Sequence, residues 1–181
     1  MMKTNVSLLR RAALLTLSVV ALGQAVASHA AGAEITRYPN PAGAVTSKAV
    51  EIAGAPSLIF VSGNTPVPAD PKAAEFSPAY WGDTEAQTAS VLKKIEAALA
   101  EARLTMADVV KLQVFLVAPA QNQLADLAGF GRGYTRYFGA ATGGKLPART
   151  VVTVASLGRP GMLVEIEVTA VRPAASAPAA K

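Results

Sequence analysis

The chain has 181 residues, and 17 Lys and Arg against 12 Asp and Glu give it a net charge of +5. This length suits a single domain. There is no cysteine and only one histidine, His29, so thiolate nucleophiles, disulfides and cysteine-ligated metals are excluded. Residues 1–30 hold three of the bases and no acid. The remainder has 14 bases and 12 acids, and a charge of +2 is too small for the broad basic field that binds nucleic acid.

Residues 1–30 have the pattern of an export signal. A basic start is followed by an apolar run over residues 12–27, and small residues then mark a cleavage site after Ala30, with Ala33 as a second possible site. A retained membrane anchor is the alternative, but the run is shorter than the ~20 residues of a membrane span. We therefore expect a periplasmic or secreted protein that loses His29 with its signal. The basic residues of the start are Lys3, Arg10 and Arg11.

The rest of the chain divides into three parts. Residues 31–44 are expected to be an N-terminal extension, and residues 45–172 a single domain. Residues 173–181 consist almost entirely of Ala, Pro and Ser, which predicts a disordered tail.

The first half of the domain reads as two strands, a loop and a helix. Residues 45–52 and 58–62 favour strands with a hairpin-like connection between them. The proline-rich residues 64–82 predict a long irregular loop. A helix follows, with a capping box formed by Thr84 and Gln87 and an apolar face that should lie on a sheet.

The second half of the domain reads as a strand, a helix and two further strands. Residues 109–117 are β-branched and alternate in polarity, which predicts a strand. Leu124, Leu127, Tyr134 and Phe138 suggest a second helix, and residues 149–156 and 162–171 two final strands. The order ββαβαββ indicates an α+β fold with two helices on one face of a sheet. The other face should be buried by another subunit.

Two features of the final strands carry candidate chemistry. Glu165 and Glu167 project from the same face of a strand and form either an acid–base pair or a solvated strand face. Arg149 stands where a glycine-rich loop meets a strand, and its guanidinium suits either a substrate carboxylate or a structural salt bridge. Residues 139–145 have the glycine and lysine spacing of a phosphate loop, but they lack the following hydroxyl and the preceding strand.

The run from Leu146 to Leu157, LPARTVVTVASL, followed by Leu163 to Val171, LVEIEVTAV, resembles the C-terminal signature of the Rid (YjgF-type) reactive-intermediate deaminases. Matches elsewhere extend the similarity over about residues 45–171. They are Val61-Ser62-Gly63, Gln87-Thr88, Asp108 to Lys111, Tyr134 and Tyr137-Phe138.

The resemblance implies a homotrimer of chorismate-mutase-like α+β subunits, with ligand clefts between subunits. It implies that Arg149 binds the carboxylate of an imine or enamine acid and that Glu165 orients the water that hydrolyses it to a 2-oxo acid and ammonia. Ser62, Gly63 and Tyr134 would line the same cleft. No metal or organic cofactor is implied, and neither is nucleic acid or a membrane partner after signal cleavage.

Three positions depart from the family pattern. Thr46, Gly131 and Val151 stand where the family often has Tyr, Asn and Cys, so the walls and polarity of the cleft differ and the smallest imine need not be preferred. Two functions follow from the sequence: a cofactor-free imine deaminase, or a non-catalytic trimer that binds small carboxylates.

Overall fold

The computed structural model describes residues 33–120 and 123–173. The expected signal over residues 1–30 and the expected tail after residue 173 lie outside the described residues, so they stay predictions. Among the described residues, no helix is long and apolar enough to span a membrane.

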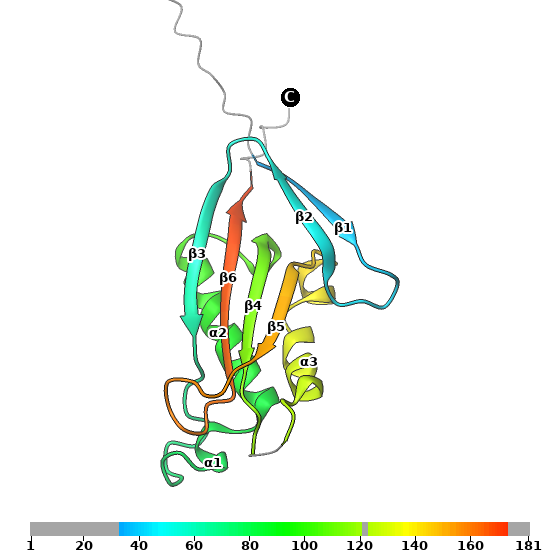
Figure 1. The fold of residues 1–181 in the computed structure, drawn as a ribbon. Helices are drawn as coiled ribbons and strands as arrows, with labels where there is room; N and C mark the ends of the chain where they lie inside the picture. Colours follow the sequence, from blue (N-terminus) through cyan, green and yellow to red (C-terminus); the bar gives the residue numbers. More distant parts are fainter. Residues whose placement is uncertain (1–32, 121–122, 174–181) are drawn as a thin grey trace, which may run out of the picture.

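A four-stranded sheet forms the centre of the fold (Figure 1). Its order is β3 (Ser57–Asn64), β6 (Val164–Arg172), β4 (Val109–Leu116) and β5 (Ala148–Thr153). β6 is antiparallel to β3 and β4, whereas β4 and β5 are parallel. The strands over residues 109–117, 149–156 and 162–171 are therefore confirmed to within a few residues.

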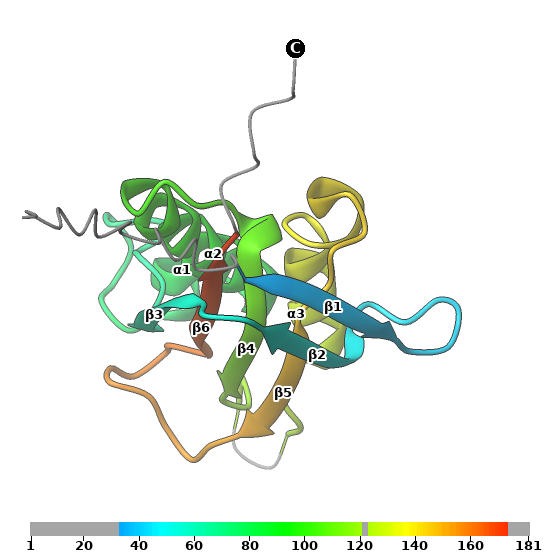
Figure 2. The same cartoon turned by 90° about the horizontal axis from the view of Figure 1, so that it is seen from above.

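Two helices, α2 (Thr84–Glu101) and α3 (Leu127–Thr135), pack on one face of this sheet (Figure 2). Alternate residues of β4 and β6 point at them and are buried, since successive side chains of a strand lie on opposite faces. The core joins both helices to the sheet, which confirms the predicted α+β fold. Its helical members are Val91, Leu92, Ile95, Leu99, Phe130 and Tyr134.

The predicted capping box is wrong. Asp83 is the residue that caps α2, and its Oδ1 accepts a hydrogen bond of 2.8 Å from the Ala86 N–H. Gln87 is instead fully buried. Its amide donates to the Gly82 and Gly161 carbonyls and accepts from the Leu163 N–H at 2.7 Å, so Gln87 fastens two loops to the helix.

The second helix is shorter than the sequence predicts. It begins at Leu127, and Leu124 and Leu127 are 91% and 62% exposed, so neither belongs to the core. The long loop contains a single short helix, α1 (Pro78–Trp81). Trp81 is buried and donates to the Pro160 carbonyl at 2.8 Å, so it joins the long loop to the loop before β6.

The predicted hairpin of the first two strands is also wrong. β2 (Ser47–Ala53) pairs with β1 (Glu34–Pro39), an unpredicted strand, while β3 pairs with β6. Strands β2 and β3 diverge after the turn at Gly54 (Figure 1), because the side chains of Ile59 and Val61 in β3 point toward the core. β1 lies inside the expected extension, so the folded domain begins before residue 45.

Close approach of α3 to α2 gives a stability prediction. A Cβ at Gly133 would lie 2.7 Å from the Thr88 Cβ and 2.9 Å from the Glu85 carbonyl oxygen. Gly133→Ala should therefore lower the free energy of unfolding by about 1–3 kcal/mol, as measured by urea denaturation.

Gly131 supplies the matched control on the same helix. A Cβ there would meet nothing within 4 Å, so Gly131→Ala should stabilise the protein by about 0.5–1 kcal/mol. Equal effects at the two glycines would contradict the packing described here.

Candidate functional site

Arg149 lies near the start of the edge strand β5, opposite Leu112 of β4. Leu112 is fully buried beneath the helices. Paired residues of neighbouring strands point to the same face of a sheet, so the Arg149 side chain lies on the helix-covered face.

The guanidinium of Arg149 lies over two aromatic rings of α3. Its central carbon is 4.4 Å from the ring centre of Tyr134 and 5.1 Å from that of Phe130, within the range of cation–π attraction. Its Nη1 is buried without a hydrogen-bond partner among the described residues. Burial lowers the pKa of Arg149, and the neighbouring Tyr134 opposes this effect. A buried cationic donor without an acceptor is costly, so this nitrogen is suited to an anionic ligand.

The ring of Tyr134 packs against the Arg149 guanidinium. It is fully buried, and its hydroxyl donates to the Val45 carbonyl at 3.1 Å. Burial raises the pKa of this hydroxyl to about 12, although Arg149 acts in the opposite direction. The structure shows Tyr134 stacked against Arg149, and its predicted contact with substrate stays a prediction.

The β1–β2 hairpin is fastened to the segment just before Arg149. Ser47 donates from its hydroxyl to the Leu146 carbonyl at 2.6 Å and from its N–H to the Pro147 carbonyl at 3.0 Å. Arg37 adds hydrogen bonds of 3.0–3.1 Å to the carbonyls of Leu146, Ala107 and Val109. These contacts hold the Val45 carbonyl within hydrogen-bond distance of the Tyr134 hydroxyl. Because Arg37 of β1 makes three of them, β1 is part of the domain.

The second group of predicted residues gathers around a β-bulge in β3. Val61 is paired with Val168 and Asn64 with Ile166, so β3 has one residue more than β6 between these pairs, and the bulge falls at Ser62 and Gly63. A Cβ at Gly63 would lie 2.2 Å from Oε1 of Glu165. Glycine therefore lets the Glu165 carboxylate approach the backbone of β3. Bulges of this kind often re-aim side chains beside active sites.

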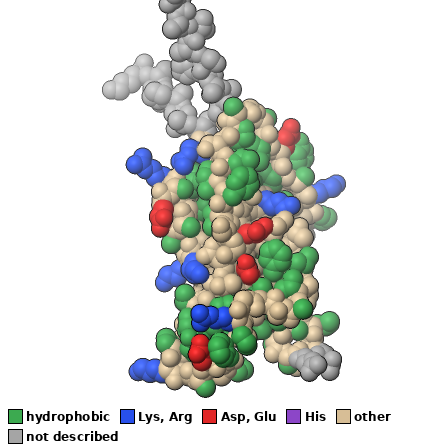
Figure 3. Space-filling model, turned by 60° about the vertical axis from the view of Figure 1, so that its left-hand side comes forward, with side chains coloured by type: hydrophobic (Ala, Val, Ile, Leu, Met, Phe, Trp, Pro, Cys, Tyr) green, Lys and Arg blue, Asp and Glu red, His purple; other side chains and the backbone are tan. Residues whose placement is uncertain are grey.

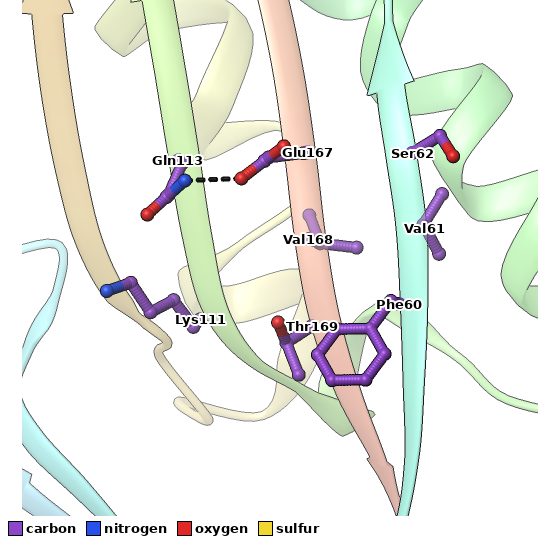
Figure 4. A pocket seen from close by; sticks show the side chains of 8 residues that line it. All are labelled: Phe60, Val61, Ser62, Lys111, Gln113, Glu167, Val168 and Thr169. Carbon is purple, nitrogen blue, oxygen red and sulfur yellow. Dashed lines mark hydrogen bonds between the residues drawn. The ribbon is translucent and has the colours of Figure 1, made fainter.

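Next to this bulge is a shallow pocket of about 320 Å³ on the open face of the sheet (Figure 4). Glu167 and Gln113 point toward one another across it, and the Gln113 amide donates to the Glu167 carboxylate. Sequence reasoning did not identify Gln113, because its partner is 54 residues away along the chain. The other residues lining the pocket are Phe60, Val61, Ser62, Lys111, Val168 and Thr169.

The predicted site is thus divided into two half-sites within one chain. Arg149 and Tyr134, the arginine half-site, lie on the helix-covered face at the β5 edge. Glu165, Ser62 and Gly63, the glutamate half-site, lie on the open face near the opposite edge. One chain alone cannot present Arg149 and Glu165 to the same small molecule.

Charged side chains of both signs are interspersed over the face shown in Figure 3, and no continuous basic band crosses it. Among the residues that the structure describes, no three His, Cys, Asp or Glu side chains are grouped so that they could hold a metal ion.

Comparison with known proteins identifies the family. Residues 37–172 match the family model described as Endoribonuclease L-PSP. A RutC family protein of Pyrococcus abyssi is 34% identical over 134 residues, which are 74% of this chain and 91% of the relative. The chain therefore belongs to the Endoribonuclease L-PSP family, which includes the RutC, YjgF and Rid proteins. The resemblance found in the sequence is confirmed.

Solved structures agree with this assignment. The structure of YyfB from Yersinia pestis, described as a member of the Rid protein family, has a TM-score of 0.53 and 27% identity, and the match covers 75% of this chain and 98% of that one. The structure of E. coli TdcF with bound serine has a TM-score of 0.50 and 30% identity, with 64% and 81% of the two chains covered.

The raised pKa of Tyr134 gives a pH-dependent prediction. The ordinary value is 10.0 and the folded value about 12, so the unfolded chain releases this proton first. The resulting stabilisation is complete below pH 10 and is lost between pH 10 and 12, by up to about 2.7 kcal/mol. Tyr134→Phe should lose about 1 kcal/mol at pH 8, with its hydrogen bond to Val45, but decline less between pH 10 and 12.

Urea denaturation of both proteins at pH 8, 10, 11 and 12 measures this difference. An equally steep alkaline decline in Tyr134→Phe would show that the hydroxyl is not held in the protonated form by its burial.

Proposed function

We propose that this protein is a cofactor-free deaminase that hydrolyses imine and enamine acids to 2-oxo acids and ammonia. The observation that carries the proposal is the buried, unpartnered Nη1 of Arg149 above two aromatic rings. Membership of a family that includes Rid proteins supports it.

Arg149 would bind the carboxylate of the substrate. Hydrogen bonds to charged groups contribute about 1.5–3 kcal/mol, and a guanidinium matches a carboxylate through two parallel N–H donors. The aromatic rings limit the freedom of the guanidinium, so little rotamer entropy remains to be lost on binding. That the TdcF structure holds serine, an amino acid with a carboxylate, is consistent with such a ligand.

Glu165 would act on the water. The carbon of a protonated imine is already electrophilic, so positioning of the water and removal of one of its protons are the main requirements. Glu165 accepts a proton as the water oxygen bonds to the carbon, and the resulting carbinolamine receives that proton on its nitrogen. The C–N bond then breaks as the hydroxyl of the carbinolamine gives its proton to the Glu165 carboxylate, so ammonia leaves and the carbonyl of the 2-oxo acid forms. An enamine first takes a proton on carbon to give the same imine.

The complete cleft requires more than one chain, because Arg149 and Glu165 lie on opposite faces of the sheet. We propose a homotrimer in which the glutamate half-site of one subunit faces the arginine half-site of its neighbour. Exposed apolar side chains on the two edge strands support such an assembly: Phe60 of β3 is 76% exposed, Leu58 44% and Val152 of β5 42%.

The three departures from the family pattern bear on substrate size. Gly131 follows Phe130 in α3 and leaves open space where a side chain would stand. Thr46 lies in the segment that crosses Tyr134, and Val151 packs against the core. Arg149 and Glu165 are both retained, so the proposed chemistry remains available, with room for imino acids larger than the smallest.

We propose further that the protein is exported, on the basis of the signal pattern in residues 1–30. The mature chain recovered from the periplasm or the medium should begin at Ala31 or Glu34, as found by mass spectrometry of its N-terminal peptide. An intact N-terminus in the cytoplasmic fraction would contradict export.

The proposed activity can be tested with imino acids generated by an amino-acid oxidase in the presence of semicarbazide, which traps the imine that escapes hydrolysis. Added protein should reduce the semicarbazone signal. Arg149→Ala should weaken the apparent substrate affinity about 10- to 150-fold, and Glu165→Gln should lower turnover about 10²- to 10⁴-fold. Arg159→Ala, at an exposed arginine paired with Glu75, is the matched control and should behave as the wild type.

Mixing these two impaired variants tests the shared cleft. Each mixed trimer holds one cleft with both wild-type residues, so unfolding and refolding an equal mixture should restore about a quarter of the wild-type activity. Failure to recover activity would place the reaction within one chain. Pyruvate binding by calorimetry without turnover for any imino acid would favour the carboxylate-binding trimer instead.

A further inference from the structure

Glu165 and Glu167 are the same residue type on the same face of β6, yet their neighbours across β4 differ. Glu167 lies opposite Gln113, whereas Glu165 lies opposite Phe115. One glutamate therefore faces an amide that can donate hydrogen bonds, and the other faces an aromatic ring that cannot.

The hydrogen bonds follow this difference. The Gln113 Nε2–H donates to Oε1 of Glu167, and the two side chains reach toward each other between β4 and β6 (Figure 4). Glu165 has no hydrogen-bond partner among the described residues, and Gly63 leaves its carboxylate lying against the β3 bulge. Of the two carboxylates, Glu165 is the one that no donor among the described residues holds.

Without Gln113, the carboxylates of Glu165 and Glu167 would compete for the substrate nitrogen and for the water. Residues two apart in a strand are separated by about 7 Å, so both side chains can reach one small cationic group. An unrestrained Glu167 would attract the substrate nitrogen, or a water, away from the position that Glu165 serves. A misplacement of about 1 Å is enough to slow a reaction strongly.

We infer that Gln113 is a positioning residue: by binding Glu167, it keeps that carboxylate away from the reacting atoms and leaves Glu165 as the sole acceptor of the proton from water. This inference rests on the proposed deaminase function. It adds Gln113 and assigns different roles to the two glutamates, which the sequence pattern alone cannot tell apart.

The semicarbazide assay with Gln113→Met tests the inference, because Met is nearly as long as Gln but lacks the donor. Turnover should fall about tenfold with little change in KM, since the arginine half-site that binds the substrate carboxylate is untouched. Adding Glu167→Gln to this variant removes the competing charge and should restore most of the turnover. A merely structural role for Gln113 would not be rescued in this way.

Two further variants make the comparison complete. Glu167→Gln alone should keep near wild-type turnover, whereas Glu165→Gln should lose it. Thr150→Val is the matched control, because Thr150 lies opposite Gln113 on β5 and loses a hydroxyl without disturbing the Gln113–Glu167 pair.

The outcomes separate this inference from the function on which it rests. An active wild type whose Gln113→Met variant turns over equally fast, or whose double variant is not rescued, overturns the role of Gln113 alone. Loss of turnover in Glu167→Gln as severe as in Glu165→Gln overturns the assignment of the two glutamates. An inactive wild type that still binds pyruvate overturns both proposals together.

Discussion

The stacking of the Arg149 guanidinium on Tyr134 and Phe130 is the interaction on which the site depends. It places a permanent positive charge against apolar rings, where solvation is reduced and attraction to an anion is correspondingly stronger than in water. The protein satisfies the tyrosine hydroxyl through Val45 but leaves one guanidinium nitrogen without an acceptor. A carboxylate at this position would supply the missing acceptor, so in the proposed function the packing of the domain would itself favour acidic ligands.

The alternation of side chains between the two faces of the sheet determines which residues of the site one chain can bring together. Because β5 is paired with β4 so that Arg149 lies opposite buried Leu112, the arginine must share the helix-covered face. Glu165 is paired with Phe115 and must point the other way. No rotamer change can reverse these directions, since a shift of register by one residue would expose the core. Assembly with another copy is therefore a geometric requirement of any reaction that uses both residues.

The sequence predicted those parts of the fold in which a strong local pattern coincides with burial. The strand at Val109–Leu116 alternates and α2 has one apolar face, and both were found. β1 was missed because its sequence, EITRYP, has no strong apolar pattern, and its place depends on hydrogen bonds from Arg37 to carbonyls 70 or more residues away. The site residues came from family resemblance and from chemistry. Their division between two faces required the pairing register, and so did the pairing of Gln113 with Glu167, which local patterns do not contain.

Each half-site is supported entirely by contacts within its own chain. The arginine half-site rests on two buried rings of α3 and on the hairpin fastened through Ser47. The glutamate half-site rests on a backbone bulge and on a glycine that admits the carboxylate. Both sets of contacts lie within one chain, so in the proposed trimer association would join surfaces that are already formed, with little further loss of conformational entropy. A cleft assembled in this way gains its precision from the folding of each chain, and the interface needs only to set the separation and angle between two rigid parts.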